Sequence, residues 1–247
     1  FGQKSDGKDF RSDILKHPPL CFVEKRIEKN SMTTEEQIIE QIKQQKLLPL
    51  FYHADETICV ETVKALYAAG IRAAEFTNRG AAALHNFKAL VEERNRSMKD
   101  LLLAAGTIRS SRQANDFIDA GADFLISPVF DAGVCDAAYS NKTLWIPGCA
   151  TPTEIHVADE AGCKLIKIFP GNQLGPSFIK SIKEIFPNIY FMPTGGVEPT
   201  GENLHAWFAA GVCAVGMGGH LISKERQDNK DFAGITKRVI QVLDILR

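Results

Sequence analysis

The chain has 247 residues, of which 45% are hydrophobic and 24% are charged, and its formal net charge is -1. This composition is typical of a globular protein with a large core, and the near-neutral charge argues against nucleic acid as a partner. The sequence contains no apolar run near the roughly 20 residues that a membrane-spanning helix needs and no signal-peptide pattern, so we expect a cytoplasmic protein.

The six cysteines are scattered without a Cys-x-x-Cys pair, and the six histidines lack the spacing of metal ligands. Isolated cysteines suit reduced thiols in a reducing compartment. We therefore expect a protein without a metal site.

Residues 1–31 differ in kind from the rest of the chain. They are charged and polar, include Pro18-Pro19, and begin with Phe, while Met32 stands just before a capping-box pattern at Thr33 to Glu36. We interpret residues 1–31 as a disordered or non-native extension and Met32 as the natural start. A processing segment is the alternative, which the mixture of acids and bases disfavours. The capping box precedes three isoleucines at helical spacing, which predicts a short N-terminal helix.

The remainder, residues 32–247, repeats one pattern, in which an amphipathic segment ends in Ala-Gly and a short apolar run follows. Glycine closes the last turn of a helix, so each pair marks a helix stop before a strand. The pairs are Ala69-Gly70, Ala120-Gly121, Ala161-Gly162 and Ala210-Gly211. Further strand-like runs occupy 47–52, 101–105, 144–147 and 189–193.

About eight strand and helix units of this kind predict an α/β protein with a (β/α)8 TIM barrel, covered at its bottom by the N-terminal helix. A doubly wound open sheet is the competing fold. No Gly-x-Gly-x-x-Gly follows the first strand, and polar or Gly-rich motifs follow nearly every strand, so the barrel is favoured.

Lys167 lies inside the apolar run from Lys164 to Pro170, in a segment that reads as a strand. A buried ammonium is costly, whereas a neutral amine in an apolar site is a nucleophile toward carbonyl carbon. The pattern indicates a Schiff-base lysine. The alternative is a lysine whose stem packs while its head reaches water.

Other polar residues follow the predicted strands, where barrel enzymes place catalytic groups. Glu75 lies in an otherwise apolar strand, where it needs an ionic partner or a catalytic task. Arg79 offers a bidentate fork to a carboxylate or phosphate, and Thr107 and Thr194 offer hydroxyls next to glycines. A structural ion pair, a solvated loop arginine and ordinary turn chemistry are the respective alternatives.

Two Gly-rich turns follow the last two predicted strands, at Thr194 to Val197 and at Gly216 to His220. Such turns can direct backbone N–H groups at an anion, and many barrels bind phosphate in this corner. The pair of turns favours a phosphorylated ligand.

With these motifs in this order, the chain resembles the 2-keto-3-deoxy-6-phosphogluconate / 4-hydroxy-2-oxoglutarate aldolase family, class I pyruvate aldolases on a (β/α)8 barrel. The resemblance covers about residues 47–222. It implies that Lys167 forms an imine with the keto carbon of pyruvate, that Glu75 is the general acid and base, and that no cofactor is needed. It also implies a homotrimer.

The same resemblance implies the substrate contacts. The carboxylate would lie on Arg79, Thr107 and Thr194, the pocket wall would come from Pro128 and Phe169, and the phosphate would lie on Gly195, Gly196, Gly218 and Gly219.

Two departures from the family pattern affect the expected substrate. Many relatives have Ser where this chain has Gly219, so one hydroxyl contact to the phosphate is missing, and Asn78-Arg79-Gly80 replaces the more usual Leu-Arg-Thr. Two other functions remain open: a phosphosugar epimerase or isomerase on the same barrel, which leaves Lys167 without a role, and a non-catalytic barrel that binds keto acids or phosphosugars.

Overall fold

The computed structural model describes residues 34–247, so the expectations for residues 1–31, for Met32 as the start and for the capping threonine Thr33 lie outside the described residues. The first helix is α1 (Thr34–Gln45). The strands are β1 (Leu47–Phe51), β2 (Ala73–Thr77), β3 (Leu102–Gly106), β4 (Phe124–Ile126), β5 (Leu144–Ile146), β6 (Gly148–Cys149), β7 (Leu165–Ile168), β8 (Tyr190–Pro193) and β9 (Val215–Met217).

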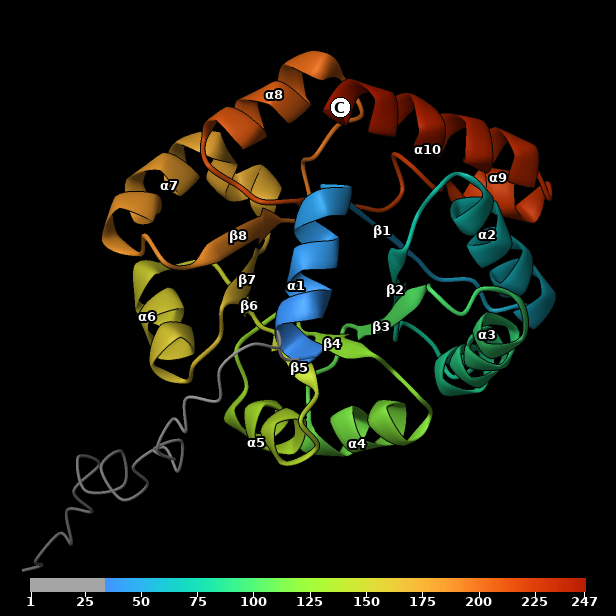
Figure 1. Cartoon of the computed structure of the whole chain (residues 1–247), viewed down its shortest axis with the longest axis horizontal. Helices are drawn as coiled ribbons and strands as arrows, with labels where there is room; N and C mark the ends of the chain where they lie inside the picture. The colour runs from blue at the N-terminus through green and yellow to red at the C-terminus, as the bar shows by residue number, and fades with distance from the viewer. Residues whose placement is uncertain (1–33) are drawn as a thin grey trace, which may run out of the picture. The chain divides into compact units, whose positions relative to one another are not determined.

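Helices alternate with these strands, and they lie outside the curled sheet that the strands form (Figure 1). They are α2 (Glu56–Ala68), α3 (Ala83–Ser97), α4 (Ser111–Asp119), α5 (Ala132–Ser140), α6 (Pro152–Glu160), α7 (Gly171–Ile185), α8 (Gly201–Ala209), α9 (Lys224–Asp228) and α10 (Phe232–Leu246). The glycines of the four Ala-Gly pairs all have positive φ, between 85° and 101°, which confirms them as helix stops.

All pairs of strands in the described chain are parallel, in a six-stranded order β5-β4-β3-β2-β1-β9 and a three-stranded order β6-β7-β8. A parallel bridge between Thr194 and Gly216 links the end of β8 to β9. The strand order follows the chain without the reversal of a doubly wound sheet, so that alternative is wrong. The single strand expected at 144–147 is instead two short strands, β5 and β6, which together extend to residue 149. They are separated at Pro147, which lacks a backbone N–H donor for the sheet.

The buried side chains form two clusters. One fills the interior of the curled sheet, where Ile38, Ile39 and Ile42 of α1 pack with Leu48, Phe124 and other strand residues. The larger cluster lies between the strands and the outer helices. Helix α1 thus covers one opening of the sheet, as the sequence predicts, and the polar strand ends lie away from it. None of the described helices is both long and apolar enough to cross a bilayer.

Candidate active site

The two ionisable residues that the sequence singles out meet inside the curled sheet. Lys167 on β7 is 5% exposed and Glu75 on β2 is 1% exposed. Because β2 and β7 are not hydrogen-bonded neighbours, their side chains meet across the interior, with Lys167 Nζ 3.7 Å from Glu75 Oε1. This distance is compatible with an ion pair but exceeds that of a normal hydrogen bond.

Glu75 is unusual because both of its carboxylate oxygens are buried and have no hydrogen-bond partner among the described residues. Gly106 on β3 makes room for it, since a Cβ atom at this position would overlap Oε1 of Glu75. Buried acceptors without partners are rare and costly, so a water or a ligand is expected to satisfy them.

Thr194, at the end of β8, repeats this feature. Thr194 is 7% exposed, and its Oγ1 atom is buried and has no hydrogen-bond partner in the described chain. Its backbone N–H donates to Ile168 beside Lys167, at 3.0 Å, so the hydroxyl belongs to the same end of the sheet as the amine. Gly216 leaves space for it, because a Cβ there would overlap Oγ1. The Glu75 carboxylate and the Thr194 hydroxyl therefore both lack hydrogen-bond partners in the described chain, near the carboxyl end of the sheet.

A cavity of about 800 Å³ opens over this end of the sheet. Its lining includes Arg79, Phe169, Thr194, Gly195, Gly196, Gly218 and Gly219, all of which the sequence predicts as substrate contacts. Phe169 is 37% exposed, and its ring centroid lies 5.5 Å from Lys167 Nζ. The lysine thus lies beside the cavity, under an aromatic wall.

Thr107 and Pro128 are not among the side chains that line this cavity in the described part of the chain. Thr107 follows β3, is half-buried and has a left-handed φ of 63°, which is uncommon for a residue other than glycine. Pro128 follows β4, and its carbonyl approaches Gly148, the residue that pairs with Lys167 in the sheet. Both therefore lie at the expected strand ends, and their contact with a ligand stays a prediction.

The cavity also has a polar wall that the sequence analysis missed. His53, after β1, lies with Nε2 3.0 Å from Oδ1 of Asp228 on α9, and its Nδ1 accepts a hydrogen bond from the Asp55 backbone. Hydrogen bonds from Lys224, and then from His53, lower the pKa of Asp228. The position of His53 just after the first strand was the available signal, because the same rule identified Glu75 and Arg79.

The structure explains the glycine in the Asn78-Arg79-Gly80 sequence. A Cβ atom on Gly80 would overlap the hydroxyl of Tyr52, which also lines the cavity. Tyr52 and Gly80 are therefore matched, and a larger residue at position 80 would require the tyrosine to move.

One thiol lies close to this site. Cys149 on β6 pairs with Ile168 of β7, and burial raises its pKa from 9.0 to about 12. The thiol is neutral near pH 7, so it does not compete with the amine as a nucleophile. Among residues 34–247, no group of His, Cys, Asp and Glu side chains is placed to hold a metal ion.

Comparison with known proteins identifies relatives over most of the chain. A family model for the KDPG and KHG aldolases matches residues 38–238. The 2-dehydro-3-deoxy-phosphogluconate aldolase of Treponema pallidum is 30% identical over 210 residues, which cover 85% of this chain and 97% of that protein. The 2-dehydro-3-deoxy-6-phosphogalactonate aldolase of Escherichia coli is 36% identical over 121 residues, which cover 49% of this chain and 58% of that enzyme.

A solved structure shares both the fold and part of the sequence. The KDPG aldolase of Legionella pneumophila superimposes with a TM-score of 0.77 at 26% identity, over 85% of this chain and 98% of that one. Its crystal held pyruvate captured at low pH as a covalent carbinolamine intermediate.

Proposed function

This chain belongs to the KDPG and KHG aldolase family, and from that membership we propose that it cleaves 2-keto-3-deoxy-6-phosphogluconate, 4-hydroxy-2-oxoglutarate or both through an imine on Lys167. The products are pyruvate with glyceraldehyde 3-phosphate from the first substrate, and pyruvate with glyoxylate from the second. The observation that carries this assignment is the buried pair of Lys167 and Glu75, 3.7 Å apart, with both carboxylate oxygens unpartnered in the described chain.

In the first half of the reaction, Lys167 passes a proton to Glu75, and its amine attacks the keto carbon and forms a carbinolamine. Glu75 returns the proton as the carbinolamine loses water, which gives a protonated imine. The imine accepts the electron pair of the breaking C–C bond, while the substrate hydroxyl loses a proton and becomes the aldehyde. Glu75 is the group placed to take up and return these protons, directly or through a water, because its free oxygens face the amine.

In the second half, the enamine that remains takes a proton on carbon and becomes the imine of pyruvate. Water then adds to the imine carbon, pyruvate leaves, and the amine is regenerated. The pyruvate imine is thus a common intermediate for both substrates, so it can be trapped without knowing which aldehyde the enzyme prefers.

Substrate binding is assigned to the strand ends. Arg79 pairs with the carboxylate, and the hydroxyls of Thr194 and Thr107 bind beside it; the unpartnered Oγ1 of Thr194 supports its role. Phe169 and Pro128 form the wall. The phosphate lies on the backbone of the Gly195-Gly196 and Gly218-Gly219 turns, both in the cavity lining, where Gly219 supplies no hydroxyl.

We also infer that the curled sheet is a closed barrel and that the protein forms a homotrimer. Counting β5 and β6 as one interrupted strand makes a closed (β/α)8 barrel, which the bridge between Thr194 and Gly216 supports. The homotrimer is inferred from the family membership, with the exposed apolar side chains of Val129, Tyr139 and Val157, which are 50%, 56% and 43% exposed, as candidates for its interface. Sedimentation would test the trimer. A cytoplasmic location stays a prediction.

The test is to incubate the protein with pyruvate and borohydride and to locate the reduced adduct by peptide mass spectrometry. We expect an adduct on Lys167, none in Lys167→Met, and full labelling in Lys164→Met, which removes an exposed lysine of the same segment. Folded protein without an adduct would overturn the aldolase mechanism and favour an epimerase or a non-catalytic barrel. Comparison of kcat/KM for the two substrates and the galactonate epimer then settles preference.

A further inference from the structure

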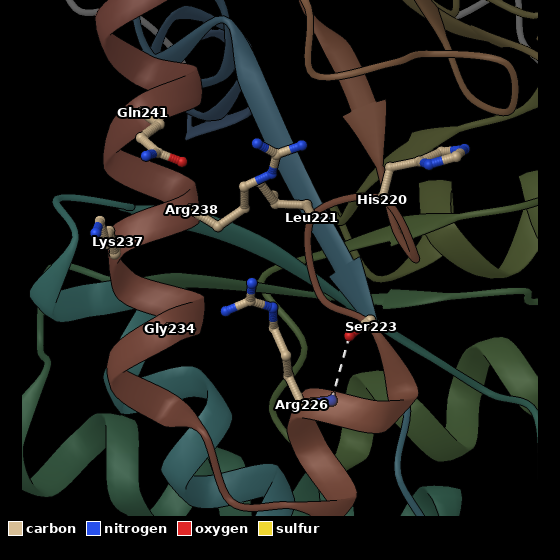
Figure 2. Close-up of a pocket in the computed structure, with 8 residues that line it drawn as sticks. All are labelled: His220, Leu221, Ser223, Arg226, Gly234, Lys237, Arg238 and Gln241. Carbon is tan, nitrogen blue, oxygen red and sulfur yellow. Dashed lines mark hydrogen bonds between the residues drawn. The ribbon is translucent and has the colours of Figure 1, made fainter.

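A second cavity, of about 400 Å³, lies between α9, α10 and the segment from His220 to Ser223 (Figure 2). Three side chains in its lining are cations at neutral pH, namely Arg226, Lys237 and Arg238, and Gln241 and Ser223 add polar groups. None of the lining residues is acidic, although the chain as a whole has a net charge of -1. The lining of this cavity is therefore net positive.

Arg226 is held in place by the start of α10. Its Nη1 atom donates to Oδ2 of Asp231 at 2.9 Å, while Oδ1 of the same carboxylate accepts from the backbone of Gly234 and caps the helix. Gly234 permits this approach, because a Cβ atom there would overlap Nη1. Within the described chain, Arg226 donates a side-chain hydrogen bond through Nη1 alone. The N–H groups on its other guanidinium nitrogens are therefore available to bind a ligand.

Arg238 lies one turn beyond Gly234 on α10 and is half-buried. Its guanidinium has no hydrogen bond or ion pair within residues 34–247. Figure 2 shows the side chains of Arg226 and Arg238 extending into the space between α10 and the segment that carries Leu221 and Ser223. Two guanidinium groups facing one space repel each other unless an anion lies between them.

The charge balance indicates the class of ligand. Three cations surround the cavity, and the carboxylate of Asp231 offsets one of them. A dianion balances the remainder, and planar guanidinium groups match phosphate oxygens in bidentate geometry. A cavity of about 400 Å³ has room for more than a free phosphate ion.

We propose that this cavity is a second anion site, which binds the phosphate of a small phosphorylated molecule between Arg226 and Arg238, outside the active-site cavity. The two cavities share a wall. His220 lines both, and α9 places Lys224 and Asp228 on the active-site cavity but Arg226 on the second one. Arg226 and Arg238 line only the second cavity, whereas the Gly195-Gly196 and Gly218-Gly219 turns line only the first, so the ligand proposed here is distinct from the phosphate assigned to those turns.

The test is an amide chemical-shift titration of the full chain with inorganic phosphate and, separately, with glycerol 1-phosphate. We expect saturable shifts at Ser223, Arg226 and Gly234. Tighter binding of glycerol 1-phosphate identifies a phosphate ester as the ligand, and equal binding identifies inorganic phosphate. Shifts confined to the Gly195 and Gly219 turns would overturn the proposal.

Variants supply the second arm of the test. Arg238→Gln removes the charge but keeps a polar side chain, and we expect its Kd for the same probe to rise about tenfold. Lys237→Gln, at an exposed position that does not endanger folding, is expected to weaken binding by a smaller factor. Arg112→Gln, on α4 and 91% exposed, is the matched control and should bind like the wild type. Unchanged Kd values in both Arg238→Gln and Lys237→Gln would refute the site. Pyruvate trapping at Lys167 needs none of these residues, so failure here leaves the proposed function standing.

Discussion

Replacement of Lys167 by Met tests whether the lysine is the counter-ion of Glu75 as well as the proposed nucleophile. The change keeps an unbranched side chain but removes the amine, and it leaves a carboxylate that is 1% exposed without its cation. At 3.7 Å and an effective dielectric constant of about 20, the lost attraction is on the order of 4 kcal/mol. Removal of one partner of a buried pair costs about 3–5 kcal/mol by experiment, so we expect a destabilisation in this range.

The double variant Lys167→Met, Glu75→Gln separates charge from packing. Because it removes the carboxylate charge together with the amine, we expect it to recover most of the stability lost in Lys167→Met, to within about 1–2 kcal/mol of the wild type. Both variants should be inactive and should form no pyruvate adduct. The comparison thus distinguishes loss of chemistry from loss of folding.

The measurement is urea unfolding followed by circular dichroism at one fixed protein concentration, since any assembly changes apparent stability by mass action. Pyruvate trapping is measured on the same samples under native conditions. A Lys167→Met variant as stable as the wild type would show that the ion pair is not formed in the folded protein. Turnover retained in this variant would refute the nucleophile itself.

Three more outcomes are expected. Gly106→Ala should lower kcat by about 10²-fold or more, because the added methyl displaces the carboxylate of Glu75, whereas Gly201→Ala, whose methyl meets only ordinary van der Waals contacts, should keep wild-type kinetics. Arg79→Ala should raise KM roughly tenfold or more with a smaller change in kcat; a change in kcat alone would contradict carboxylate binding. Because burial raises the pKa of Cys149 to about 12, the folded thiol keeps its proton while the unfolded thiol loses it above pH 9.0, so stability falls as the pH rises beyond 9.0. Thermal melts from pH 8 to 10 should show a smaller decline for Cys149→Ala, and parallel curves would refute this.

Much of the candidate site could be predicted from sequence because its signals are local. An amine inside an apolar run is visible at Lys167, and glycines past the last two strands are visible at Gly195 and Gly219. Each of these residues lies near the end of a strand in the sequence. The rule that barrel enzymes place their active-site residues at the carboxyl ends of strands was therefore sufficient to select them. The ends of four helices could also be predicted from local sequence, because the glycine after each of them adopts the left-handed backbone conformation without strain.

The parts that the sequence analysis missed depend on contacts between distant segments. His53 and Asp228 are joined across the cavity, and Tyr52 fits against Gly80, although neither pair shares a motif.

The sequence by itself determined the order of strands and helices and the position of Lys167 in an apolar strand, because periodicity and turn chemistry act over a few residues. Only the tertiary structure decided that Glu75 lies 3.7 Å from this amine with both oxygens free, and that Arg226 and Arg238 face one cavity. The curl of the sheet brings Glu75 to Lys167, and the packing of α9 against α10 brings Arg226 to Arg238. Because these contacts depend on how separate elements pack, the spacing of the residues along the chain does not predict them.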